Sequence, residues 1–277
     1  MAQLRNVLLV VVLATAAAGC GSGSAASPAT TTAPAPPKPF RIVFPEGFTR
    51  IEMGERVNKV AQIARRERGK AVRLNETSYL AASRRGSVPC FEPARRTDLE
   101  GFLFPATYDF LRQTPARALV QAQLVAFCRN WATVNLAYAR SKNLTPYDVL
   151  KIASMVEEEA AVPGDRPKIA AVIYNRLRDR MPLQIDATLR YGLHIPPTQS
   201  ITESELASNN PYNTRKRFGL PPTPIGNPGL ASIRAAAHPS QLGYLYYVRI
   251  PHTDRHAFFE SYPAYEQYLA THGYGPH

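Results

Sequence analysis

The chain has 277 residues, 45% of them hydrophobic and 19% charged, a composition ordinary for a globular protein with one large or two small domains. Its formal net charge of +12 indicates an anionic partner or surface. Charge alone leaves nucleic acid open as that partner, but the start of the chain argues for export and therefore against it.

The first twenty residues resemble an export signal. A basic segment, 1–5, precedes an apolar run, 7–18, which has the length of a signal peptide and is short for a membrane span. Small residues then precede Cys20, as at a bacterial lipoprotein cleavage site, although Ala17 stands where leucine is usual. We therefore expect a lipid on Cys20 to anchor the protein to the bacterial membrane. A retained N-terminal helix and plain secretion are the alternatives.

Residues 21–39 predict a disordered linker, because they are rich in Pro, Ser, Thr and Ala and contain no aromatic residue and no apolar period. The simplest interpretation is a tether between the membrane and a folded part. Export also permits a disulfide between Cys90 and Cys128, with two buried free thiols as the alternative. Their spacing cannot establish that they lie close together.

The first folded stretch predicts a small α+β module. Residues 40–44 are typical of a strand, and residues 49–66 and 75–85 of two helices. An aromatic-rich connector with Gly and Pro breakers follows at 99–108. The residues expected to face inward on the first helix are Ile51, Val57, Val60, Ile63 and Ala64.

A long helix is expected over 116–143, and a second helix over 145–162 has a complete start signal. Thr145 suits the N-cap, Pro146 the first helical position and Asp148 the third. Apolar residues then recur at helical spacing and form one face: Val149, Ile152, Ala153, Val156 and Ala160.

Three glutamates, Glu157, Glu158 and Glu159, end this helix. At about 100° per residue they cannot all face one way. Glu158 points away from the apolar face, whereas Glu157 and Glu159 lie on its flanks. Burial can raise the pKa of a flanking carboxyl until it donates a proton near neutral pH. The alternative is an ordinary solvated surface run.

The next predicted helix, 166–180, carries Arg176 in the middle of its apolar face and Asn175 on the flank. A buried arginine is rarely unpaired, so we expect a glutamate partner. Two helices with polar groups at the edges of their apolar stripes predict a catalytic cleft. A buried Arg–Glu pair that serves only as a strut is the alternative.

The remaining chain adds further polar candidates. Residues 181–192 alternate like a strand and contain Gln184 and Asp186. The long loop 209–229 contains Tyr212 and Asn213 and has the length of a binding loop. Short helices are expected at 202–205, 232–237 and 262–272, and strands at 243–250 and 256–260. His238, His252 and His256 are spaced too irregularly to indicate zinc, so we expect neither a metal nor a cofactor.

Ten segments in register resemble the motifs of one family, the endolytic murein transglycosylases (MltG, YceG-like). They are PEGFT at Pro45, LEGFLFPATY at Leu99, IASMVEEEA at Ile152, IAAVIYNRL at Ile169, LQIDATLRYG at Leu183, PYNT at Pro211, GLPPTPIGNPG at Gly219, IRAAAHP at Ile233, GYLYYV at Gly243 and HAFF at His256. Four departures are Ala106, Ala187, Arg215 and Thr223, where the family often has Asp, Pro, Tyr and Gly. Arg215 lies in the predicted binding loop, where glycan or stem-peptide preference would differ.

The resemblance implies a small LysM-like module at 40–110 followed by a mixed helical/β catalytic domain at 111–277 with a lysozyme-like helical active site. With the signal peptide predicted at 1–20 and the linker at 21–39, the expected organisation is an α+β chain in four parts. The implied reaction is non-hydrolytic cleavage of the MurNAc-(β1→4)-GlcNAc bond in nascent glycan strands, which leaves 1,6-anhydroMurNAc ends and limits strand length. The implied partners are peptidoglycan strands, the bacterial membrane through the N-terminal anchor, and penicillin-binding proteins, without nucleic acid.

Helical geometry leaves Glu157 and Glu159 as candidate acids. Glu159 precedes the small residue Ala160, which resembles the Glu-Ser or Glu-Thr step of other lytic transglycosylases. We therefore predict Glu159 as general acid and base, Glu157 as the alternative acid or the partner of Arg176, and Arg176 as structural support. Glu158 is expected to be dispensable. The predicted substrate-binding residues, each with loop or turn structure as the alternative, are Asn175, Gln184, Asp186, Tyr212 and Asn213.

Two rival functions remain. A hydrolytic, lysozyme-type muramidase would share the acid, and a non-catalytic peptidoglycan-binding scaffold would keep the module with an inert helix.

Overall fold

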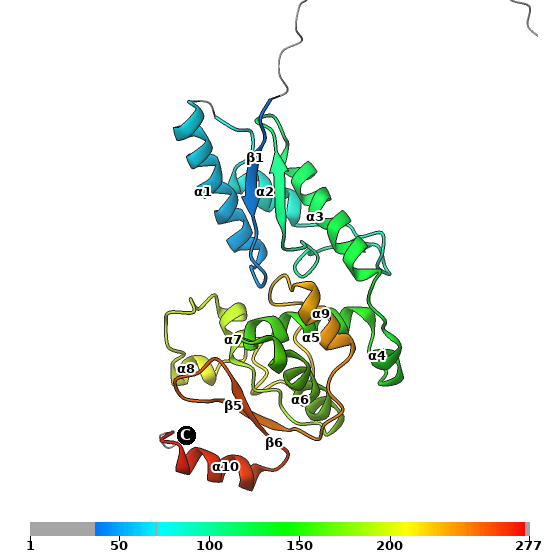
Figure 1. Ribbon diagram of the computed structural model, residues 1–277, viewed down its shortest axis with the longest axis vertical. Coiled ribbons are helices and arrows are strands. Elements are labelled where there is room, and N and C mark those ends of the chain that lie inside the picture. The colour runs from blue at the N-terminus through cyan, green and yellow to red at the C-terminus, as the bar shows by residue number, and fades with distance from the viewer. Residues whose placement is uncertain (1–36, 70, 275–277) are drawn as a thin grey trace, which may run out of the picture. The chain divides into compact units, whose positions relative to one another are not determined.

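The computed structural model describes residues 37–69 and 71–274, and the chain from Pro37 onward forms one compact unit. This unit has a mixed α+β fold that is mostly helical, with small two-stranded antiparallel sheets (Figure 1). The predicted signal peptide, Cys20 and most of the linker lie outside the described residues. Within the described ranges, no helix is both long enough and apolar enough to cross a bilayer.

A pair of strands organises the N-terminal part. β1 (Phe40–Val43) pairs antiparallel with β4 (Thr107–Phe110), and the rings of Phe40 and Phe110 stack with centroids 5.4 Å apart. The predicted strand at 40–44 and both predicted helices are confirmed, and Thr49 and Asn75 cap the helices. The elements between the paired strands are α1 (Arg50–Arg68), α2 (Glu76–Ser83), β2 (Gly86–Ser87) and β3 (Arg95–Arg96).

The inner face of α1 differs in part from the predicted one. Val57 and Ala64 are buried as expected, but Ile51 and Ile63 are 43% and 42% exposed. Gly54 explains the rotation of the buried face, because a Cβ there would lie 2.9 Å from the Leu80 side chain on α2. Close helix packing at a glycine is a tertiary effect that a hydrophobic period does not reveal.

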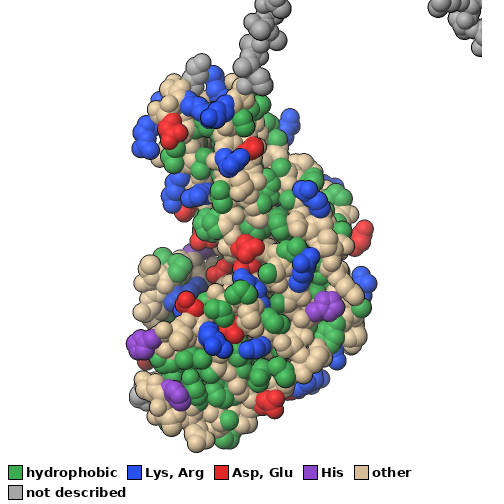
Figure 2. All heavy atoms as spheres, viewed as in Figure 1, with side chains coloured by type: hydrophobic (Ala, Val, Ile, Leu, Met, Phe, Trp, Pro, Cys, Tyr) green, Lys and Arg blue, Asp and Glu red, His purple; other side chains and the backbone are tan. Residues whose placement is uncertain are grey.

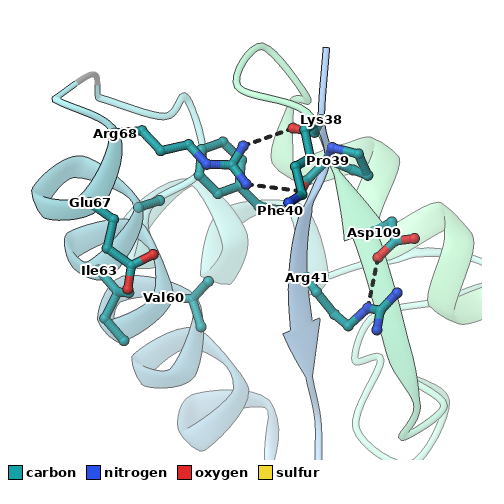
Figure 3. A pocket seen from close by; sticks show the side chains of 10 residues that line it. Lys38, Pro39, Phe40, Arg41, Val60, Ile63, Glu67, Arg68 and Asp109 are labelled. Carbon is teal, nitrogen blue, oxygen red and sulfur yellow. Dashed lines mark hydrogen bonds and ion pairs between the residues drawn. The ribbon is translucent and has the colours of Figure 1, made fainter. Parts of the chain in front are cut away.

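A groove of about 420 Å³ separates α1 from β1 (Figure 3). Arg68 donates hydrogen bonds to the carbonyls of Lys38 and Pro39, and its guanidinium lies 3.9 Å above the Phe40 ring. The groove contains none of the predicted site residues. Because arginine covers its aromatic wall, we do not place the candidate site there.

The long helix expected over 116–143 is in fact two helices, α3 (Ala116–Trp131) and α4 (Ala137–Ser141). Polar side chains bond to the backbone at the break: the Thr133 hydroxyl donates to the carbonyl of Asn130, and the Asn135 side chain accepts the N–H of Ala137. Such local bonds compete with the helix and end it.

α5 (Pro146–Glu159) is the central helix and begins as predicted. The Thr145 hydroxyl accepts the Asp148 N–H at 3.1 Å, and the Asp148 carboxylate accepts the Thr145 N–H at 3.0 Å. The whole predicted apolar face is buried. It packs against α6 (Arg166–Arg178) and α9 (Leu230–Ala237), so the core fixes the position of the C-terminal end of α5.

The strand expected over 181–192 is wrong, because α7 (Asp186–Leu193) occupies most of it. Leu183 and Ile185 do alternate as buried positions, but Thr188 and Leu189 are buried consecutively, as on a helix. The remaining predicted elements are confirmed near their expected positions: α8 (Glu203–Leu206), β5 (Tyr246–Arg249), β6 (His256–Phe259) and α10 (Tyr262–Thr271).

Cys90 and Cys128 form a disulfide with Cα atoms 5.5 Å apart, which decides between the bridge and two free thiols. The bridge closes a loop with a sequence separation of 38 and attaches the β2–β3 segment to α3. A cross-link over such a loop stabilises a fold by about 3–4 kcal/mol, chiefly through the unfolded state. We expect the double variant Cys90→Ala/Cys128→Ala to lose this free energy of unfolding in urea titration. The reduced wild type should match it, and equal stability of all three forms would contradict the prediction.

Candidate active site

The three glutamates lie at the C-terminal end of α5, where Ala160 leaves the helix in an extended conformation. The helix dipole places partial negative charge at this end and disfavours ionised carboxylates. Figure 2 shows a hollow in this face of the molecule with acidic side chains gathered at its inner wall. The end of α5 is therefore a place where a carboxyl group retains its proton more readily than in water.

Glu159 has the surroundings of a general acid. The Tyr247 hydroxyl, from β5, donates a hydrogen bond to Glu159 Oε2 over 3.0 Å. Burial raises the pKa of Glu159 to about 6; the Tyr247 hydrogen bond opposes this shift, and the negative charge of Asp186 adds to it. A carboxyl with this pKa stays partly protonated near neutral pH and can pass its proton to a leaving oxygen.

Glu158 is exposed, as its helical position predicts, but two loops approach its carboxyl. Its Oε1 lies 2.8 Å from where a Cβ on Gly47 would stand and 3.6 Å from that position on Gly226. Partial burial of the carboxyl by these loops, followed by the charges of Glu52 and of the two neighbouring glutamates, raises the pKa of Glu158 to about 7. Helical geometry predicts that the Glu158 side chain points away from the core, but it cannot predict which loops approach the carboxyl.

Because the pKa of Glu158 is raised as well as that of Glu159, Glu158 is a second candidate for the role of acid. Hydrogen bonding distinguishes the two carboxyls. Tyr247 holds the Glu159 carboxyl in one orientation. Among residues 37–69 and 71–274, no donor forms a hydrogen bond to the Glu158 carboxyl. Because proton transfer requires a positioned group, the geometry favours Glu159.

Glu157 is paired, but not with Arg176. Its Oε2 accepts the Gly229 N–H at 2.8 Å, and its Oε1 lies 3.5 Å from Arg166 Nη2. The predicted Glu157–Arg176 pair is wrong because Arg166 begins α6, next to the end of α5, whereas Arg176 lies about three turns further on. Glu157 therefore holds the chain at the start of α9. Glu46 lies nearby, and its pKa is raised mainly by burial and next by the negative charge of Glu157.

Arg176 is 8% exposed, and its partners are mainly backbone carbonyls. Nε donates to Leu245 O at 2.7 Å, and Nη1 donates to Pro182 O at 3.1 Å and Leu183 O at 2.8 Å. Nη1 also lies 3.2 Å from Gln184 Oε1. Arg176 thus joins α6 to the segment before α7 and to the start of β5, the strand that carries the tyrosine beside the candidate acid.

Asp186 lies near the acid, and an arginine holds it. Its Oδ1 accepts from Arg215 Nε at 2.9 Å and from Arg215 Nη2 at 2.7 Å. The Asp186 side chain is 48% exposed, and its charge reaches Glu159. Gln184 is exposed and has a left-handed backbone, with φ 55°, so its side chain remains available to a ligand apart from its contact with Arg176.

Two other predicted ligands have structural contacts. Asn175 Nδ2 donates to Leu242 O and Tyr244 O, and Asn213 Nδ2 donates to Leu206 O and Ser208 O. These bonds occupy both amide protons of each residue. Asn175 and Asn213 therefore shape the loops that border the site.

Tyr212 bridges the loop that contains it. Its hydroxyl lies 2.8 Å from Thr223 Oγ1, and its ring packs on that of Tyr191 with centroids 5.1 Å apart. It is half-buried, so one part of the ring is available to a sugar and the rest is packed.

A second polar cluster joins motifs that are far apart in the sequence. Glu100 is buried and accepts hydrogen bonds from the Arg50 N–H at 2.9 Å, from Asn227 Nδ2 at 2.7 Å and from the Tyr191 hydroxyl at 3.1 Å. Burial raises the pKa of Glu100 to about 8, opposed by the hydrogen bond from the Arg50 N–H. Asn227 Oδ1 also accepts the Leu103 N–H at 2.9 Å, so this amide connects three segments.

The PEGFT turn packs directly on the GNPG loop. The Gly47 N–H donates to Asn227 O at 2.9 Å, and the Asn227 N–H donates to Phe48 O at 3.1 Å. A Cβ on Gly226 would lie 2.3 Å from the Gly47 carbonyl oxygen, which only glycine permits. The first turn of the N-terminal part thus lies beside the end of α5.

Sequence reasoning missed Tyr247, Glu46, Glu100 and Asn227 as members of the site. Each belongs to a segment quoted for the family resemblance, and a polar group within a largely apolar motif was the available signal. Their partners are distant in sequence, so spacing did not identify them. Within the described part of the chain, no three His, Cys, Asp or Glu side chains gather as metal ligands.

Comparison with known proteins identifies the family. The YceG-like family profile matches residues 24–271, most of the chain. The chain belongs to the YceG-like family. This confirms the assignment made from the ten motifs.

Among the similar proteins are endolytic murein transglycosylases. That of Bacillus subtilis (strain 168) is 38% identical over 152 residues, which cover 54% of this chain and 41% of the relative. That of Streptococcus pneumoniae (strain R6) is 38% identical over 168 residues, which cover 58% and 30%. The matched region thus spans less than half the length of these relatives. A crystal structure of a YceG-like protein from Listeria monocytogenes superposes with a TM-score of 0.67 at 27% identity, covering 83% of this chain and 76% of that one.

Proposed function

We propose that this chain is an endolytic lytic transglycosylase that cleaves the MurNAc-(β1→4)-GlcNAc bond of peptidoglycan strands and leaves 1,6-anhydroMurNAc ends. The observation that carries the proposal is the Glu159 carboxyl, whose pKa is raised to about 6 and which Tyr247 holds in place. Membership of the YceG-like family and the names of the Bacillus and Streptococcus relatives support it.

One carboxyl suffices for this reaction. Glu159 donates its proton to the glycosidic oxygen as the bond from that oxygen to the anomeric carbon breaks. The resulting carboxylate then accepts the proton of the muramoyl 6-hydroxyl, whose oxygen bonds to the anomeric carbon. Glu159 returns to its protonated form, and no water is consumed. The nucleophile belongs to the substrate, so proximity replaces an external group.

A lysozyme-type hydrolase is the alternative, and Asp186 is the observation in its favour. Hydrolysis requires a second carboxylate as base or nucleophile, and the Asp186 charge reaches Glu159. However, Asp186 Oδ1 already accepts two hydrogen bonds from the Arg215 guanidinium. These bonds hold the Asp186 carboxylate toward Arg215 and occupy Oδ1, which favours the single-acid mechanism.

The N-terminal part is proposed to be a LysM-like module, with the catalytic domain following near residue 111. Its support is the antiparallel pairing of β1 with β4, with the two helices α1 and α2 and the short strands β2 and β3 between them in the chain. In this proposal the module binds glycan and delivers the strand to the hollow beside α5. A non-catalytic scaffold would keep this role but tolerate loss of Glu159.

The protein is proposed to act outside the cytoplasm, held at the bacterial membrane by a lipid on Cys20 or by an N-terminal helix. Its support is the sequence of residues 1–20 together with the disulfide, which suits an oxidising compartment. The proposed partners are peptidoglycan strands and, in wall assembly, penicillin-binding proteins.

The test is digestion of purified glycan strands, stripped of peptides, with the full chain and mass analysis of the fragments. Internal fragments ending in an anhydro sugar, lighter than a reducing end by one water, would support the proposal. Reducing ends would indicate the muramidase, and intact strands the scaffold.

Glu157→Gln is expected to be intermediate in activity. The amide oxygen still accepts the Gly229 N–H, but the attraction to Arg166 is lost, so the start of α9 shifts relative to α5. We expect kcat/KM for anhydro product to fall by about tenfold, equivalent to about 1.4 kcal/mol in the barrier. Glu158→Gln is the matched control, because no described group forms a hydrogen bond to its carboxyl, and its loss should be smaller. A larger loss of kcat/KM in Glu158→Gln than in Glu157→Gln would contradict this prediction.

A further inference from the structure

Tyr247 packs against a histidine on the neighbouring strand. β5 and β6 pair antiparallel, with Tyr247 opposite Phe258 and Arg249 opposite His256. Alternate residues of a strand share a face, so Tyr247 and His256 lie on the same side of this sheet. Their ring centroids are 5.4 Å apart with 84° between the planes, an edge-to-face contact.

His256 is itself held by two bonds to one oxygen. Asp165 Oδ2 accepts the His256 backbone N–H at 2.8 Å and lies 3.0 Å from His256 Nδ1. Both side chains are buried, at 7% and 5% exposure. Asp165 ends the short 3₁₀ turn, η1 (Pro163–Asp165), that follows α5. The two contacts fix both the position of the strand and the plane of the imidazole ring.

A buried pair of this kind is not required for packing. Removing two polar groups from water is unfavourable, and apolar residues of similar size often stabilise a fold as well or better. The pair does, however, connect the segment that follows the candidate acid to the strand that carries Tyr247. Its position indicates a role in orientation.

We propose that Asp165 and His256 are positioning residues for the general acid. Asp165 orients the His256 ring, the ring limits the tilt of Tyr247, and the Tyr247 hydroxyl then holds the Glu159 carboxyl toward the bond that breaks. This inference rests on the proposed function, because it takes Glu159 as the acid. Neither Asp165 nor His256 is assigned a contact with substrate.

Other charged groups lie around this series of contacts. Lys168 Nζ, on α6, lies 3.9 Å from Asp165 Oδ1 and 5.2 Å from the centre of the Phe258 ring. Arg176, also on α6, acts on Tyr247, and Asp186, on α7, acts on both Tyr247 and Glu159. None of these three residues is changed in the variants below, so their charges act equally on the pKa of Glu159 in every variant.

The test measures the ionisation of Glu159 directly. Glutamate is labelled with ¹³C at the side-chain carboxyl, the Glu159 signal is assigned by its loss in Glu159→Gln, and the signal is followed through a pH titration of the full chain. The Tyr247 hydrogen bond favours the ionised carboxylate, so loosening it raises the pKa of Glu159. We expect His256→Phe and Asp165→Asn each to raise it by about one unit, in the direction of Tyr247→Phe.

The matched control is His238→Phe, an exposed histidine after α9, which should leave the titration unchanged. The double variant His256→Phe/Tyr247→Phe should shift no further than Tyr247→Phe alone, because both act through one hydroxyl. The proposal would be overturned if the pKa of Glu159 equals the wild-type value in both His256→Phe and Asp165→Asn. It would also be overturned if the pKa shifts of the two single variants add in the double variant. If His256→Phe does not fold, Asp165→Asn, which keeps the shape of the side chain, provides the same test.

Activity gives a second, separate readout. If anhydro product forms, we expect His256→Phe to lower kcat by about tenfold with little change in KM, since no contact with substrate is lost. A wild type that forms no anhydro product would overturn the proposed function, whereas the titration would still decide whether His256 orients the carboxyl. An unchanged kcat in a folded, active His256→Phe would count against the positioning role.

Discussion

Glu159→Gln is expected to abolish anhydro product while the chain stays folded. The amide keeps the size of the side chain and still accepts the Tyr247 hydrogen bond, but it has no proton to deliver to the glycosidic oxygen. General acid catalysis is worth about 10²–10⁴-fold, and here the same group also removes the proton from the 6-hydroxyl, so the loss should reach at least the upper end. The measurement is the initial rate of anhydro product from purified strands.

Glu158→Gln is the control for this experiment, because Glu158 precedes Glu159 on the helix and its pKa is also raised, to about 7. It should retain most of the activity. Loss of activity in Glu158→Gln together with retention in Glu159→Gln would move the acid by one residue and contradict the assignment.

Glu159→Gln should also stabilise the fold at neutral pH. The pKa of Glu159 is about 6 in the folded chain against a reference of 4.5, so the folded state holds the proton more tightly than the unfolded state. Stability from this group is fully present below about pH 4.5 and is lost as pH rises through about 6. The free energy of unfolding of the variant should exceed that of the wild type by up to about 2 kcal/mol at pH 7 and by little at pH 4. Urea unfolding at the two pH values measures this difference, and an equal gain at both would contradict burial of the carboxyl.

Arg176→Met is expected to produce the largest loss of stability. Its guanidinium donates to the carbonyls of Leu245, Pro182 and Leu183, and methionine leaves these three carbonyls without this donor. At about 1–3 kcal/mol for each unsatisfied buried group, we expect a loss of about 5 kcal/mol in the free energy of unfolding. Arg176→Lys should recover only part of it, because one ammonium cannot reach acceptors on two segments.

Arg178→Met is the matched control on the same helix, since Arg178 is exposed and its salt bridge is with the neighbouring Asp179. It should change stability by less than about 1 kcal/mol. Equal midpoints for Arg176→Met and Arg178→Met in urea would mean that the buried carbonyls find other donors, and would remove the support role of Arg176.

Local signals predicted α5 and its glutamates well. The cap of α5 involves Thr145 and Asp148, three residues apart, and its buried face repeats within the helix, so a short window contains all the information. The same reasoning failed over 116–143, where side-chain bonds to the backbone around Asn135 divide the helix. It failed again at α7, where two buried positions resembled the alternation of a strand.

The partners of the site residues were less predictable, because they are distant in sequence. Arg176 was correctly predicted to be buried, but a hydrophobic period cannot show that its acceptors are carbonyls of two other segments. Glu159 was selected from its flank position and from a family resemblance, whereas Tyr247 lies 88 residues away and is brought to it only by the packing of β5. Patterns along the chain thus indicated the carboxyl, and tertiary packing supplies the group that orients it.

The most direct test of the proposed mechanism is digestion of glycan strands in water enriched in ¹⁸O. If the muramoyl 6-hydroxyl attacks the anomeric carbon, the new ends have the anhydro mass and contain no ¹⁸O, because no water enters the product. We predict this result for the wild type and no product for Glu159→Gln. New reducing ends that contain one ¹⁸O atom would show that water is the nucleophile, and would contradict a lytic transglycosylase.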